Sequence, residues 1–198
     1  MMSQTHVLLA SAILAKPGAK LRNTAVITGA ILPDIAIYGL LIWSKLQNIP
    51  EAKVWNELYW QDPWQTYTAA GNSVPIYGLL VLLGLVILRG VPGLFRLGVF
   101  AVFLAMAAFI HIAGDLPVHV VDAHRHFWPI SDWKFISPVS YWDPNHHGRS
   151  FMVFEAILGL GLSGLLFKQF KNWAIRVTIL ICVAAYLAVP AYFILQLG

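Results

Sequence analysis

The feature that most constrains this chain is a series of long apolar blocks that contain almost no charged residues. Five segments come close to the length of about 20 residues that a helix needs to cross the hydrocarbon core of a membrane; they are residues 24–43, 74–88, 97–116, 151–167 and 173–197. Helices suit that environment because they satisfy their own backbone hydrogen bonds where water is absent. The sequence therefore predicts an all-α, polytopic membrane helix bundle with about five spans.

Composition agrees with a membrane protein and excludes some other classes. Only 11% of the 198 residues are charged, whereas a soluble domain has roughly a quarter. The length suits a single domain over residues 1–198. The net charge of +4 does not indicate a nucleic-acid partner, because the basic residues are spread along the edges of the apolar blocks. The single cysteine, Cys182, excludes an intramolecular disulfide and a cysteine-based zinc site.

The N-terminal stretch 5–15 is apolar but too short to cross a membrane alone. We expect a short helix that packs against the bundle or spans half of the membrane. A cleaved signal peptide is the alternative, and cleavage would remove His6. That alternative is disfavoured because the stretch lacks the basic region with which signal peptides begin.

The loops predict how the chain is oriented. The connections 16–22, 89–96 and 168–176 carry basic residues and no acidic ones, which is typical of the cytoplasmic side. Residues 44–73 and 117–150 contain or border seven of the eight tryptophans, and tryptophan favours the headgroup region. We expect these two interfacial loops on the opposite face, the periplasmic one if the membrane is a bacterial inner membrane.

All seven histidines fall at or near that same face in this topology, and imidazole is the commonest metal ligand. The strongest local pattern places His111, Asp115 and His119 at spacings of four and eight, close to one helical face. Pro117 should break or kink the helix, which would carry His119 away from that face. The alternative interpretation is an ordinary His–Asp hydrogen bond at the end of a span.

Asp34 lies in the middle of an apolar block and therefore needs a partner. An ionised carboxylate in a membrane helix costs about 3 kcal/mol on insertion scales, and no basic residue is close by in this block. A protonated, hydrogen-bonded carboxyl is the alternative. Because the predicted topology brings His6, Asp34, His111 and Asp115 to a similar depth, we predict that they bind a divalent metal, with Zn²⁺ as the leading candidate.

Further polar residues of this face are candidates for supporting roles. A metal-activated reaction needs a general acid or base, and guanidinium groups bind phosphate or carboxylate in bidentate fashion. The alternative is a loop that lies on acidic headgroups. The catalytic or additional-ligand candidates are His119, His124, His126 and Glu155, and the substrate-binding candidates are Arg125 and Arg149.

Several of these motifs resemble a known family. Thr5-His6, Leu32-Pro33-Asp34, the His111-to-Asp115 helix and Trp128-Pro129 stand in the order found in the membrane-bound metal-dependent hydrolases that include a LexA-regulated inner-membrane protein. That family is distantly similar to zinc-dependent phospholipases C. The chain departs from it between residues 66 and 73, where the family's His-Arg-Gly-x-Thr-His-Ser element is absent. The resemblance implies that the histidines after position 118 take over the missing ligand positions.

Three functions remain open at this point. The first is a membrane-embedded metal-dependent hydrolase that acts on an ester or phosphoester, carried by a lipid or a lipid-linked molecule, at the periplasmic face. The second is a non-catalytic accessory protein in which a metal staples the helices, and it predicts four protein ligands with no open position. The third is a small metal- or ion-handling transporter, and it predicts polar residues that continue to the cytoplasmic side.

Overall fold

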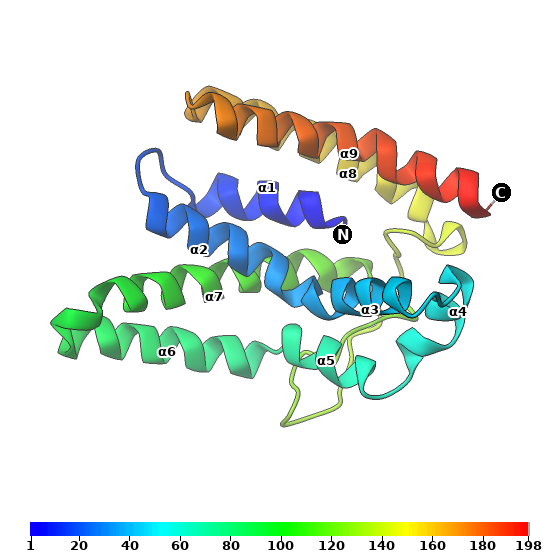
Figure 1. The fold of residues 1–198 in the computed structure, drawn as a ribbon, viewed down its shortest axis with the longest axis horizontal. Coiled ribbons are helices and arrows are strands. Elements are labelled where there is room, and N and C mark those ends of the chain that lie inside the picture. Colours follow the sequence, from blue (N-terminus) through cyan, green and yellow to red (C-terminus); the bar gives the residue numbers. More distant parts are fainter. Residues whose placement is uncertain (198) are drawn as a thin grey trace.

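The computed structural model describes residues 1–197, with side chains described as far as Ala188, and this part of the chain is helical without strands (Figure 1). The prediction of an all-α fold is confirmed. Short 3₁₀ turns join several of the helices. The α-helices are α1 Ser3–Leu14, α2 Lys20–Ile31, α3 Ile35–Leu46, α4 Glu51–Asn56, α5 Trp64–Gly71, α6 Val74–Gly90, α7 Phe95–Asp115, α8 Gly148–Gln169 and α9 Trp173–Leu197.

Three helical segments of the described residues are long and apolar enough to cross a membrane: Lys20–Leu46, Pro92–Val118 and Gly148–Gln169. A fourth is possible if α5 and α6, which meet at a bend of 42°, count as one broken span. The apolar part of α9 that was searched, Trp173–Ala188, is shorter. The structure thus supports a membrane protein with three or four candidate spans, and it does not confirm the prediction of about five.

Helix α7 is central to the bundle. Helices α2 and α6 both pack along it, α1 contacts α2, α7 and α8, and α8 pairs with α9 (Figure 1). Small residues let α2 and α7 approach closely, as is common between membrane helices: Ala25, Ala105 and Ala108 are fully buried in one core cluster. The closest approach is at Gly29, where a Cβ atom would lie 2.0 Å from the backbone oxygen of Leu104.

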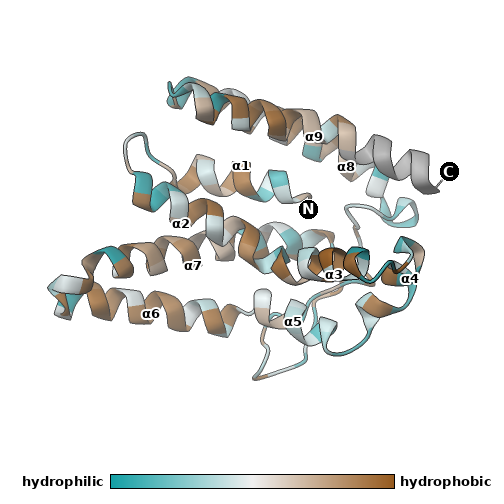
Figure 2. Cartoon of the chain, in the orientation of Figure 1, coloured by the Kyte–Doolittle hydropathy of each residue, from teal (hydrophilic) through white to brown (hydrophobic). Residues whose placement is uncertain are grey.

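The outer faces of the helices are apolar. Large side chains such as Leu82 of α6, Val153 of α8 and Ile181 of α9 are more than half exposed, and hydrophobic colouring extends along these helices (Figure 2). In water, exposed apolar surface of this extent would promote aggregation. In a membrane it is the surface that faces lipid.

The two ends of the bundle differ in character. The three basic connections, between α1 and α2, α6 and α7, and α8 and α9, lie together at one end (Figure 1). The N-terminus of α1, the segment 47–73 and the loop 116–147 lie toward the other end. The segment 47–73 is largely helical, since it contains α4 and α5. At a rise of 1.5 Å per residue, α7 carries the chain about 30 Å from the basic end to Asp115, which matches the thickness of the hydrocarbon core.

The contact between α2 and α7 yields a stability prediction. Replacing Gly29 with alanine should force the two helix backbones apart, because the added methyl group meets a carbonyl that cannot rotate away. We expect Gly29→Ala to lower the free energy of unfolding by about 1–3 kcal/mol. Thermal unfolding in detergent measures this, with Gly39→Ala as the control, because a Cβ atom at Gly39 meets nothing within 4 Å. Equal stability of the two variants would contradict the close approach.

Candidate metal centre

Three segments that are distant in sequence bring the predicted metal ligands together. His111 and Asp115 lie in the last turns of α7, and His6 lies in the first turns of α1. Asp34 lies in the 3₁₀ turn Leu32–Asp34, between α2 and α3. This turn interrupts the helix because Pro33 has no N–H with which to continue the hydrogen-bond ladder. The turn itself contacts α7, which places Asp34 next to the end of that helix.

The side chains are in close contact and almost completely buried. Asp115 Oδ1 lies 2.9 Å from His6 Nε2, and Asp115 Oδ2 lies 2.9 Å from His111 Nε2. Asp34 Oδ1 lies 3.5 Å from His111 Nε2, so the structure brings Asp34 beside its expected partner. The imidazole rings of His6 and His111 stack, with their centroids 3.6 Å apart. The amino group of Met1 also contacts Asp115 Oδ1.

The protonation of His111 favours a cation between these groups. His111 Nδ1 lies 2.7 Å from the backbone oxygen of Ala30, and a carbonyl only accepts hydrogen bonds, so Nδ1 carries the proton. In the neutral ring the lone pair of Nε2 then faces the carboxylates of Asp34 and Asp115. Within the described part of the chain, neither Nε2 of His111 nor either ring nitrogen of His6 makes an aligned hydrogen bond. Buried lone pairs that face carboxylates repel them unless a proton or a metal ion lies between.

The spacing of these atoms fits a metal ion. A zinc ion with ligands at about 2.0–2.1 Å in tetrahedral geometry holds neighbouring ligand atoms roughly 3.3 Å apart. The nitrogen–oxygen contacts in this group are 2.9 to 3.5 Å long and involve three different carboxylate oxygens. One ligand atom from each of His6, His111 and Asp115 lies within 4.8 Å of the others. His6, His111 and Asp115 therefore form a buried group that could hold a metal ion, and Asp34 could serve as a fourth ligand.

Asp115 also belongs to a second group, with His119 and His124. Asp115 Oδ1 lies 3.4 Å from His119 Nε2, and the rings of His119 and His124 are 4.7 Å apart. Helix α7 does end before Pro117, as the sequence indicates, but His119 stays beside Asp115. The reason is the fold of the loop: the backbone N–H of Ser137 donates to the oxygen of His119 at 2.9 Å and holds this segment over the end of α7.

The two loop histidines differ in their protonation. Burial disfavours the charged form of His119, but the carboxylates of Asp115 and Asp122 outweigh it and raise its pKa to about 8. For His124, burial and the neighbouring His119 lower the pKa to about 3. His124 is therefore a neutral imidazole at neutral pH, the form that binds metals. His119 needs a metal or a proton to balance the two carboxylates that face it.

The remaining predicted residues lie outside both groups. His126 is buried, with its ring 5.9 Å from that of His124 and its Nδ1 3.2 Å from the backbone oxygen of Asn72. Glu155 is fully buried, and it accepts a hydrogen bond from the backbone N–H of Met2 at 2.6 Å. Arg125 pairs with Asp132 at 3.1 Å, and Arg149 is exposed in the first turn of α8. His126 is thus placed beside the cluster, whereas within the described residues no hydrogen bond or ion pair joins Glu155 or either arginine to the ligand atoms.

Sequence reasoning missed residues that hold the cluster in place. Ser3 Oγ donates to Asp34 Oδ2 at 2.6 Å and receives a hydrogen bond from the Tyr38 hydroxyl at 2.5 Å. The Ala30 carbonyl orients His111. A Cβ atom at Gly114 would lie 3.4 Å from His6 Cε1, so this glycine leaves room for the ring. Of these residues only Gly114 could have been noticed in the sequence, because it lies between the predicted ligands His111 and Asp115. The other contacts join different helices and depend on how those helices pack.

Comparisons with known protein families, with curated proteins and with solved structures found no match to this chain. The site is therefore interpreted from its own geometry.

Metal binding should stabilise the protein. A ligand at a hundred times its dissociation constant adds about 2.7 kcal/mol to the free energy of unfolding. We expect Zn²⁺ to raise the melting temperature of chelator-treated protein in detergent, and we expect His111→Gln to reduce that rise. His147→Asn is the matched control, since His147 is an exposed histidine in a left-handed conformation that asparagine tolerates. An unchanged melting temperature for the wild type over a full zinc titration would exclude a metal centre here.

Proposed function

We propose that this protein is a membrane-embedded, metal-dependent hydrolase that cleaves an ester or phosphoester of a lipid or lipid-linked molecule. The observation that carries this proposal is the buried His/Asp cluster, whose ring nitrogens face carboxylate oxygens without aligned hydrogen bonds. Such a cluster is costly to bury unless protons or cations balance its carboxylates. The choice of a hydrolase rests on the order of the short sequence motifs, and no family model matches the chain.

The proposed chemistry assigns a role to each group of residues. A bound divalent ion, with Zn²⁺ as the leading candidate, supplies a Lewis acid that activates water and polarises the scissile phosphoryl or carbonyl oxygen. His6, His111 and Asp115 would hold the ion and leave one position for water, with Asp34 beside His111. The Ala30 carbonyl keeps the Nε2 atom of His111 directed at the site. His126 is the favoured general base, because it lies beside the cluster with its Nδ1 already held by the backbone of Asn72.

The depth of the cluster supports a lipid-borne substrate. Asp115 ends a helix that is long enough to cross the hydrocarbon core from the basic end of the bundle. The cluster then lies at the level where lipid headgroups meet the hydrocarbon. By the positive-inside rule this is the periplasmic face, if the membrane is a bacterial inner membrane.

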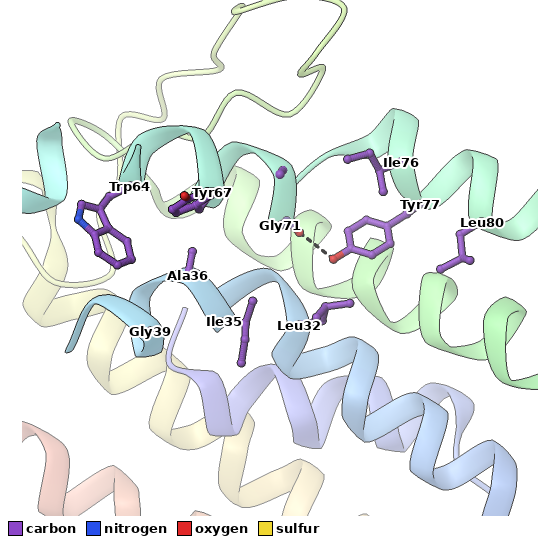
Figure 3. A pocket seen from close by; sticks show the side chains of 11 residues that line it. Leu32, Ile35, Ala36, Gly39, Trp64, Tyr67, Gly71, Ile76, Tyr77 and Leu80 are labelled. Carbon is purple, nitrogen blue, oxygen red and sulfur yellow. Dashed lines mark hydrogen bonds between the residues drawn. The ribbon is translucent and has the colours of Figure 1, made fainter. Parts of the chain in front are cut away.

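A neighbouring cavity supports an acyl chain as part of that substrate. It has a volume of about 470 Å³ and lies between the start of α3 and helices α5 and α6 (Figure 3). Leu32, two residues before Asp34, and Ile35, the residue after it, both line the cavity. The hydroxyl of Tyr77 is turned to the backbone oxygen of Gly71 at 2.8 Å, so its polar atom is already satisfied. The remaining lining is apolar or aromatic, as the binding of a lipid tail requires.

Activity should depend on the metal cluster. Zinc-loaded wild-type protein in mixed micelles should release product from at least one member of a panel of carboxylic esters, phosphodiesters and phosphomonoesters carried by lipids. Asp34→Asn should lower kcat/KM by about 10- to 100-fold or more, the cost of losing a ligand or its orienting partner. Asp62→Asn, at an exposed carboxylate, should change nothing. If zinc-loaded wild type cleaves no member of the panel, the hydrolase proposal fails and the metal-stapled accessory protein takes its place.

The cavity should govern preference for long acyl chains. Gly39 lines the cavity, and a Cβ atom there meets no other atom within 4 Å. Gly39→Leu should therefore raise KM for a long-chain substrate while leaving a short-chain analogue unaffected. Gly164→Leu is the matched control, because Gly164 is also an exposed helical glycine with open space around it, on α8. Equal KM changes for long and short chains would remove the cavity from substrate binding.

A further inference from the structure

The cluster contains more ligands than one metal ion can use. A zinc site in a hydrolase takes three protein ligands and keeps one position for water. His6, His111 and Asp115 already supply three ligands, and Asp34 lies beside them. His119 and His124 then form a second group that reaches the same Asp115 from the loop after α7.

The two groups approach the carboxylate of Asp115 from different elements. His111 Nε2 faces Oδ2 at 2.9 Å, from within α7. His119 Nε2 faces Oδ1 at 3.4 Å, from the loop, and His6 Nε2 and the amino group of Met1 contact the same oxygen. An ionised carboxylate has two oxygens with about four lone-pair sites, so it can bind two cations at once. Asp115 is therefore placed to bridge two ions.

Buried groups in the second set independently indicate a cation. His119 is 7% exposed, and within the described residues neither of its ring nitrogens makes an aligned hydrogen bond. Its Nδ1 lies 3.0 Å from Asp122 Oδ2, so carboxylate oxygens face both sides of the ring. His124 and His126 are also buried beside it. With one cation at the first group, only a proton on His119 could balance Asp115 and Asp122, and His124 would have no cation to bind.

We propose that the site is a two-ion centre in which Asp115 bridges one divalent cation held by His6 and His111 and a second held by His119 and His124. This inference rests on the proposed function and deepens it. In two-ion hydrolytic centres the ions are about 3.5–4 Å apart, and they stabilise the attacking and leaving oxygens of a phosphoester together. The substrate class that such a centre favours is a phosphoester of a lipid or lipid-linked molecule, in preference to a carboxylic ester.

Metal stoichiometry tests the inference. Detergent-purified, chelator-treated protein is loaded with Zn²⁺, desalted and analysed for zinc per chain. We expect two equivalents for the wild type and for the control His147→Asn. We expect one equivalent for His124→Ala and for His6→Ala, and none for the double variant. His119→Asn serves as a second probe of the loop group, and the melting temperature of each metal-free variant shows whether it has folded.

Proximity is tested separately by loading the protein with Mn²⁺ and recording its electron paramagnetic resonance. A bridged pair gives an exchange-coupled spectrum in the wild type, whereas His124→Ala and His6→Ala give the spectrum of an isolated ion. A wild type that saturates at one equivalent would overturn the two-ion centre, and so would two equivalents without magnetic coupling.

These outcomes are independent of the hydrolase proposal. A coupled pair of ions in a protein that cleaves no substrate would leave the two-ion centre intact and remove the hydrolase. Hydrolysis by a protein that binds a single ion would keep the hydrolase and overturn the two-ion centre. Cleavage of lipid carboxylic esters but of no phosphoester would keep the hydrolase and contradict the substrate class inferred from two ions.

Discussion

The burial of the Asp115 carboxylate is the constraint on which this end of the bundle depends. The residue is 2% exposed and lies at the end of an apolar helix. An ionised carboxylate in such surroundings is tolerated only when cations or hydrogen-bond donors compensate for the loss of water. Three histidines surround it, His6 from α1, His111 from α7 and His119 from the loop that follows α7, and the amino group of Met1 also contacts it.

The contact between α2 and α7 and the turn at Pro33 hold the residues around Asp115 in place. The close approach of α2 to α7 at Gly29 places the Ala30 carbonyl where it can accept from His111. The break at Pro33 turns Asp34 toward the same ring. Because each helix contributes one part of the site, a shift of α2 against α7 would disturb both the hydrogen bond that fixes the tautomer of His111 and the position of Asp34. Structural stability and the geometry of the cluster are therefore coupled through this helix pair.

The cavity beside α3 and the cluster share the 3₁₀ turn Leu32–Asp34. Leu32 faces the cavity, while Asp34 reaches His111 on the other side of the turn. Successive residues of a helical turn point in different directions, so one short segment can present an apolar wall and a metal ligand to two different neighbours. This arrangement suits a molecule with an apolar tail and an anionic head, and it connects the membrane setting of the protein with its proposed chemistry.

The sequence by itself determined the helical class with membrane-spanning candidates, and it indicated that Asp34 would need a polar partner. Long apolar blocks permit little else in a membrane, and an isolated Asp34 requires a partner. Only the tertiary structure decided which atoms meet: the sharing of Asp115 between two sets of histidines, the role of the Ala30 carbonyl, and the return of His119 after Pro117. The number of spans also differed, with three or four candidates in the described residues where about five were predicted. The physical reason is that hydropathy indicates only whether each segment, taken alone, prefers lipid or water. Contacts between helices depend on packing between residues far apart in the chain.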